Sequence, residues 1–153
     1  MSWIDEEFKK REQAQEERQK RMAEEAARER AISEVVLPAW QRLVTVICAD
    51  VERFNKHSAR RVWTSVTDNT LQVQWNGETD FLVELELDAS KQRIVYSAPA
   101  QPPHEWKTHT GSISIRAHDG APALFAGTTP SATEQPLSYE AVSELILRAV
   151  LFR

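Results

Sequence analysis

Cysteine and glycine are scarce among the 153 residues, and their scarcity excludes several kinds of site. The single cysteine, Cys48, excludes an internal disulfide bond and a metal site built from several thiolates. The four glycines form neither the dinucleotide-binding G-x-G-x-x-G pattern nor a phosphate-binding loop with its lysine. The G-x-S-x-G motif of many serine hydrolases is missing as well. We therefore predict none of these enzyme classes.

The sequence also lacks an uninterrupted apolar run of about 18 residues, the length that a membrane-spanning helix needs. Its N-terminal region is densely charged, unlike a secretory signal peptide. The net charge of −4 argues against extended nucleic-acid binding, because surfaces that bind phosphates are basic. We expect a cytoplasmic protein with no membrane-inserted segment, and we do not expect nucleic acid as its partner.

The first 33 residues differ in composition from the rest, and we interpret them as a charged helical arm. Residues 1–31 hold nine acidic and eight basic side chains and contain neither glycine nor proline. Pairs such as Glu6 and Lys10 place opposite charges one helical turn apart, and each pair adds roughly 0.2–0.5 kcal/mol to a helix. Composition and charge pairing therefore both predict a solvated helix.

Large apolar residues in this arm are concentrated near its start, at Trp3, Ile4 and Phe8. Met22 is the remaining one before Ile32, so the arm lacks the repeated apolar positions of a coiled coil. An apolar tip on a polar helix is typical of a segment that docks into a groove. We predict that Trp3, Ile4 and Phe8 bind another protein or a second copy of this chain, and we favour self-association.

A strongly amphipathic helix is predicted next, over residues 36–54. Its large apolar residues recur at steps of three and four and share one side: Val36, Trp40, Leu43, Val44, Ile47, Val51 and Phe54. Because each gains roughly 1.5–3 kcal/mol on burial, this side must pack against the β-rich segment that follows. Pro38 predicts a kink, or a break near the start of a second helix.

Alternating apolar and polar residues predict strands from residue 62 onward. A two-residue turn at Asp68-Asn69 predicts three cross-strand pairs: Val66 with Leu71, Thr64 with Val73, and Val62 with Trp75. A longer loop after Trp75 and a turn over residues 88–91 predict four more: Phe81 with Val73, Val83 with Leu71, Ile94 with Leu85, and Tyr96 with Val83.

The proline-rich residues 98–111 show no strand pattern, and we predict a loop that crosses the molecule. A last hairpin turns at Asp119-Gly120, a favoured pair for a type I′ turn, and predicts two pairs: Ile115 with Leu124, and Ile113 with Ala126. A C-terminal helix capped by Ser138 has this apolar stripe: Val142, Leu145, Ile146, Ala149 and Val150.

These elements predict an α+β fold, in which an antiparallel sheet of about six strands packs against helices and a long charged helix precedes them. The predicted division is a charged arm at residues 1–33 and an α+β domain at residues 34–153. That domain comprises a helix, a four-stranded meander, a loop, a hairpin and a C-terminal helix.

Four apolar residues fall on the predicted sheet face that points away from the core: Trp63, Leu82, Val95 and Phe125. Either one helix covers each face of the sheet, which is the commoner arrangement, or this second face binds a partner. We include the four residues in the predicted partner-binding surface.

Two polar clusters are candidates for a metal-binding site and an anion-binding site. His104, Glu105 and His109 offer metal-ligand atoms, but their spacing matches no common zinc site and favours a solvated loop. A basic cluster at residues 53–61 precedes Trp63 and could hold a phosphate while the indole stacks on a base. A helix C-terminus attracts cations and explains most of this cluster, but it explains Arg60 and Arg61 only partly.

The sequence thus predicts a non-catalytic protein-interaction or assembly module, adaptor-like or chaperone-like, that uses the arm and the second sheet face. We predict no catalytic residue, no metal and no cofactor. The alternative is a small-molecule or nucleic-acid binding domain that uses Trp63 with Arg60 and Arg61 as candidate anion-binding residues.

Overall fold

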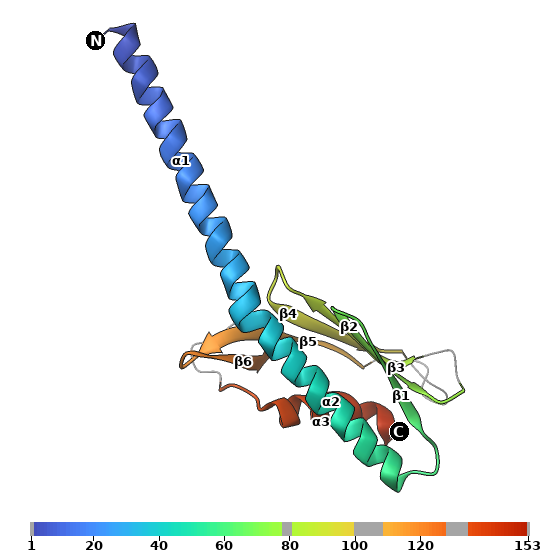
Figure 1. Cartoon of the computed structure of the whole chain (residues 1–153). Helices are drawn as coiled ribbons and strands as arrows, with labels where there is room; N and C mark the ends of the chain where they lie inside the picture. Colours follow the sequence, from blue (N-terminus) through green and yellow to red (C-terminus); the bar gives the residue numbers. More distant parts are fainter. Residues whose placement is uncertain (1, 78–80, 100–108, 128–134, 153) are drawn as a thin grey trace.

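The computed structural model describes residues 2–77, 81–99, 109–127 and 135–152. The fold is α+β, as predicted, and within the described ranges six strands form one antiparallel sheet (Figure 1). The elements in chain order are α1 (Trp3–Ala31), η1 (Ile32–Val36), α2 (Leu37–His57), β1 (Val62–Val66), β2 (Thr70–Trp75), β3 (Phe81–Asp88), β4 (Arg93–Ala98), β5 (His109–His118), β6 (Ala121–Ala126) and α3 (Tyr139–Leu151).

The three helical segments α1, η1 and α2 form one helix of 55 residues from Trp3 to His57. The hydroxyl of Ser2 caps it by accepting a hydrogen bond from the backbone N–H of Ile4. Pro38 lies in the first turn of α2, directly after the π-helical turn η1, in which the N–H of Leu37 donates to the carbonyl of Ile32. This wider turn carries the helix past Pro38 without the break that we considered.

By length and composition alone, one part of this helix is apolar enough on average to cross a membrane, although it holds no uninterrupted apolar run. The buried side chains of the helix all belong to η1 and α2: Val36, Ala39, Trp40, Leu43, Ile47 and Val51. The predicted stripe of residues 36–54 is therefore confirmed for its central members, whereas Val44 and Phe54 are only partly buried.

The strands follow one another in the sheet as β1-β2-β3-β4-β5-β6, which is a simple meander. The predicted register of the first hairpin is confirmed, because Val66 pairs with Leu71, Thr64 with Val73 and Val62 with Trp75. In the last hairpin Ile115 pairs with Leu124, as predicted. Asp119 and Gly120 have φ angles of 51° and 78°, as the predicted type I′ turn requires.

Four predicted pairs around β3 are wrong by two residues, although the faces are right. Val73 pairs with Val83 and Leu71 with Leu85. Gln74 pairs with Phe81, which is one residue from the predicted register, and a β-bulge at Val73 and Gln74 adds the second residue of the shift. On the other side of β3, Leu85 pairs with Tyr96 and Leu87 with Ile94. There the turn lies one position later than predicted, and Gln92 closes it with a φ of 52°.

Two further predictions about β5 and β6 are corrected. His109, Thr110 and Gly111 belong to β5, and His109 pairs with Ala98 of β4. The proline-rich stretch therefore connects neighbouring strands instead of crossing the molecule. Ile113 forms a bridge with Gly127, not with Ala126.

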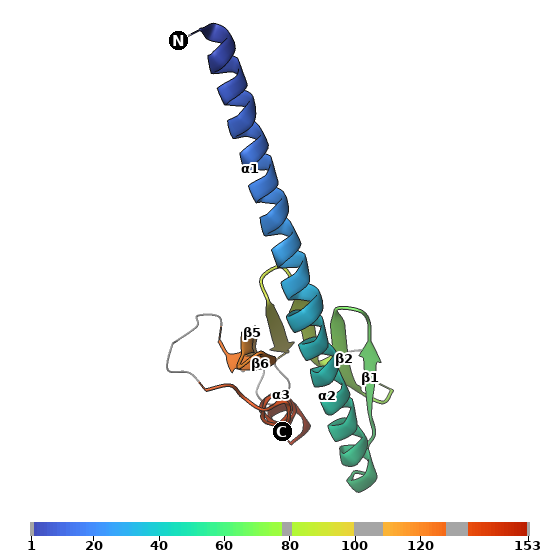
Figure 2. The same ribbon diagram turned by 60° about the vertical axis from the view of Figure 1, so that its left-hand side comes forward.

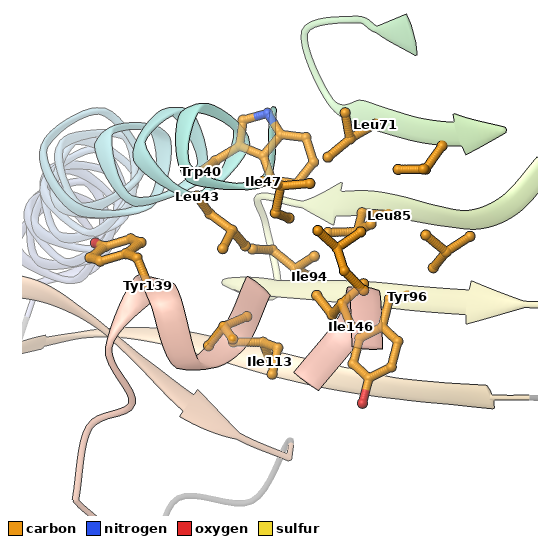
Figure 3. Packing of buried hydrophobic residues seen from close by; sticks show 14 of the residues in the cluster. Trp40, Leu43, Ile47, Leu71, Leu85, Ile94, Tyr96, Ile113, Tyr139 and Ile146 are labelled. Atoms are coloured by element: carbon orange, nitrogen blue, oxygen red, sulfur yellow. The ribbon is translucent and has the colours of Figure 1, made fainter. Parts of the chain in front are cut away.

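Both α2 and α3 pack on the same face of the sheet, which excludes the first of the two alternatives considered, one helix on each face (Figures 1 and 2). Figure 3 shows Trp40, Leu43 and Ile47 of α2 meeting apolar strand residues and Ile146 of α3. The Trp40 indole N–H also donates to the carbonyl of Asp68 at 3.1 Å, which ties α2 to the first hairpin turn. In α3, Val142, Ile146 and Val150 are buried as predicted, whereas Leu145 is exposed and Leu147 takes its place.

We predict that Gly111→Ala destabilises the fold, because a Cβ atom at this position would overlap the ring and hydroxyl of the buried Tyr96 on β4. Forcing an extra carbon into a packed site costs about 1–3 kcal/mol. Urea unfolding should show this loss, with Ser112→Ala on the same strand as the control. An unchanged free energy of unfolding would show that Tyr96 moves aside without cost.

Candidate functional site

Three large apolar side chains are exposed together at the tip of α1. The exposed fractions of Trp3, Ile4 and Phe8 are 73%, 47% and 61%, and no residue of α1 is buried. These three side chains line a shallow hollow together with Glu7 and Arg11, so they face the same side of the helix. Figures 1 and 2 show α1 extending away from the sheet, with this tip at its far end.

Acidic residues surround the apolar side chains of the tip. Asp5 and Glu6 lie in the first turn, next to Glu7 in the hollow. Carboxylates are favourable there because the N-terminus of a helix carries partial positive charge. The tip therefore presents aromatic and aliphatic side chains, with carboxylates in the first turn and the opposite charges of Glu7 and Arg11 in the hollow.

Two of the four apolar residues predicted to be exposed on the second sheet face are buried. Leu82 is 1% exposed and belongs to the core, because the bulge places two consecutive β3 residues, Leu82 and Val83, in buried positions. Phe125 is also buried: the guanidinium of Arg116 stacks 3.8 Å from the centre of its ring, and His118 meets it edge-on.

Trp63 and Val95 are exposed on this second face, by 58% and 40%. They lie on β1 and β4, with β2 and β3 between them. There Gln72 donates a hydrogen bond of 2.6 Å to Glu84 across the two strands. The exposed apolar residues of this face are thus separated by polar ones and do not form one continuous patch.

The basic cluster does not gather around Trp63. Arg60 stacks over the ring of Trp75 at 4.2 Å, and Trp75 in turn contacts Phe54 of α2, with ring centres 5.9 Å apart. Trp75 pairs with the buried Val62, whereas Trp63 is the next residue along β1 and points to the opposite face. Arg60 and Trp63 therefore belong to different faces of the sheet, and the alternative binding site is divided.

A groove with a volume of about 860 Å³ lies between α2 and α3. Its apolar wall consists of Phe54 from α2 and of Leu147, Leu151 and Phe152 from the end of α3. The rings of Phe54 and Phe152 meet edge-on with centres 5.7 Å apart, and Phe152 is one of the most exposed apolar residues of the chain.

Polar side chains hold the two walls of the groove together. The hydroxyl of the buried Ser143 donates to a carboxylate oxygen of Asp50 at 2.6 Å, which joins α3 to α2. On α3, Arg148 forms an ion pair with Glu144 one turn earlier. These contacts use both acidic groups of the groove.

The basic side chains of the α2 wall have no such contacts. Arg53 and His57 line the groove, and neither has a hydrogen-bond or ion-pair partner within the part of the chain that the structure describes. His57 lies in the last turn of α2, where a cation is favoured. The rim of the groove thus offers positive charge beside an apolar wall.

Sequence analysis did not find this groove. Its signals were present in the partly buried Phe54, at the end of the α2 stripe, and in the basic residues around it. The position of α3 alongside α2 could not be predicted from either helix alone.

The metal site considered at His104, Glu105 and His109 lies largely outside the described residues. His104 and Glu105 are not described, and for His109 only the backbone, which belongs to β5, is described. Among residues 2–77, 81–99, 109–127 and 135–152, no three His, Cys, Asp or Glu side chains lie close enough together to hold a metal ion.

Comparison with known proteins found no matching family model, no matching curated protein and no matching solved structure.

We predict that Ser143 and Asp50 stabilise the groove as a pair. Hydrogen bonds to charged groups contribute about 1.5–3 kcal/mol, so Ser143→Ala and Asp50→Ala should each lower the free energy of unfolding. The double variant should lose clearly less than the sum of the two, which urea unfolding of all four proteins would measure. Ser97→Ala, at an exposed serine, is the control. Strict additivity of the two changes would contradict the pairing.

Proposed function

We propose that this protein is a non-catalytic assembly module that associates with a second copy of itself through the tip of its N-terminal helix. One observation carries this proposal: Trp3, Ile4 and Phe8 are held in water at the end of a long helix, away from the core of their own chain. A protein gains nothing from exposing three large apolar side chains together unless another surface covers them.

The length of the helix supports the proposal. The 29 residues of α1 extend about 43 Å, at roughly 1.5 Å per residue. An exposed helix of this length presents the tip where a partner can reach it from several sides. An adaptor-like protein that binds a different polypeptide would use the same tip, and we favour a second copy because the chain itself offers an apolar groove.

The second sheet face has no part in this proposal. Two of its four predicted residues, Leu82 and Phe125, are buried, and the other two lie on strands that are not neighbours. Arg60 stacks on Trp75 and lies on the opposite face of the sheet from Trp63, so no observation brings these two residues of the alternative site together.

The test is the mass of the full-length protein in solution as a function of concentration. Each tip side chain gains roughly 1.5–3 kcal/mol on full burial, so Trp3→Ala or Phe8→Ala should weaken association by about tenfold or more. Both residues are exposed, and the free energy of unfolding should therefore stay within about 0.5 kcal/mol of the original value.

Met22→Ala is the matched control, because Met22 is an exposed apolar residue on the same helix but outside the tip. It should change the dissociation constant much less than Phe8→Ala. A protein that stays monomeric at all concentrations, or tip variants that associate as tightly as the original chain, would contradict the proposal.

A further inference from the structure

We infer that the groove between α2 and α3 receives the helix tip of a second copy, so that two chains pair with their long helices antiparallel. This inference rests on the proposed function and names the surface that the tip binds.

A tip cannot reach the groove of its own chain. Phe8 and Phe54 lie on the same uninterrupted helix, 46 residues apart, which corresponds to about 70 Å. Figures 1 and 2 show the N-terminus and the C-terminus, which follows the groove residue Phe152, at opposite ends of the molecule. A contact between tip and groove must therefore join two chains.

The groove fits the tip in its apolar chemistry. Its wall is formed by aromatic and leucine side chains, and Phe54 and Phe152 already meet edge-on in it. Trp3 and Phe8 are aromatic as well, and aromatic rings pack favourably edge to face. Covering Phe152 would also bury a large apolar side chain that is exposed in the single chain.

The charges are complementary too. The first turn of α1 carries Asp5 and Glu6, whereas Glu7 lies beside Arg11 in the hollow. The α2 wall of the groove carries Arg53, which has no hydrogen-bond or ion-pair partner among the described residues.

Of the acidic groups of the groove, Glu144 is paired with Arg148, and the Asp50 carboxylate accepts a hydrogen bond from Ser143. The two carboxylates of the first turn are therefore attracted to Arg53 at the rim of this groove.

The position of the two surfaces predicts the symmetry of the pair. The tip and the α2 wall of the groove lie near opposite ends of one helical rod. When two such rods lie antiparallel, each tip meets the groove of the other chain, and both contacts form at once around a two-fold axis. A pair of this kind is closed, so it does not grow into a filament.

The experiment measures dissociation constants of full-length variants by sedimentation at several concentrations. Phe152→Ala and Arg53→Glu change exposed groove residues and should weaken association about tenfold or more. Lys91→Glu is the control for Arg53→Glu, because it makes the same charge change at an exposed turn between β3 and β4. Raising the salt concentration should weaken the original pair and should affect the Arg53→Glu variant less.

A mixing experiment tests the antiparallel arrangement. Phe8→Ala lacks an intact tip and Phe152→Ala lacks an intact groove, so a pair of either variant alone has no intact contact. A mixed pair keeps one, between the tip of the Phe152→Ala chain and the groove of the Phe8→Ala chain. Mixing should therefore produce heterodimers at concentrations where each variant alone is monomeric, and failure to do so would overturn the inference.

The outcomes separate this inference from the proposed function. If the tip variants dissociate but Phe152→Ala and Arg53→Glu leave the dissociation constant unchanged, the groove is not the binding surface and the proposed function stands. If the tip variants associate normally, both proposals fail.

Discussion

The packing of η1 and α2 on the sheet is the contact on which the rest of the structure depends. Val36, Trp40, Leu43 and Ile47 are nearly completely buried, and the indole of Trp40 is additionally bonded to the first hairpin turn. This contact anchors one end of the long helix. Because α1 continues the same helix through the π-helical turn, the direction of α1 is set by the packing of α2 on the sheet. No contact between α1 and the sheet is required for this.

The two helices α2 and α3 cover only one face of the sheet. Since α2 and α3 lie side by side on one face, their ends leave a groove between them, lined by the last apolar residues of each helix. The opposite sheet face is largely polar, and its larger apolar residues are separated or, like Phe125, covered by a neighbouring arginine. Among the described residues, two exposed apolar surfaces thus lie at the two ends of the helical rod, and both belong to the proposed pairing.

One part of the candidate site can be recognised from neighbouring residues in the sequence, whereas the other part depends on contacts between distant residues. The tip could be found from the sequence, because three large apolar residues next to a charged helix stand out in the chain itself. The groove could not, because Phe54 and Phe152 are nearly a hundred residues apart and are joined only when α3 packs against α2. Two of the four residues predicted on the second face are buried for a related reason: whether Leu82 and Phe125 are exposed depends on a bulge and on a neighbouring side chain.

The sequence by itself determined the type of each element and the register of the two hairpins with two-residue turns. Helical and strand periodicity, and the turn residues Asp68-Asn69 and Asp119-Gly120, are properties of neighbours in the chain. Only the tertiary structure decided the registers around β3, where a bulge and the left-handed Gln92 each shift the pairing without changing the apolar pattern. It also decided that both helices share one face, because an amphipathic stripe requires a surface to cover but does not specify which side of the sheet supplies it.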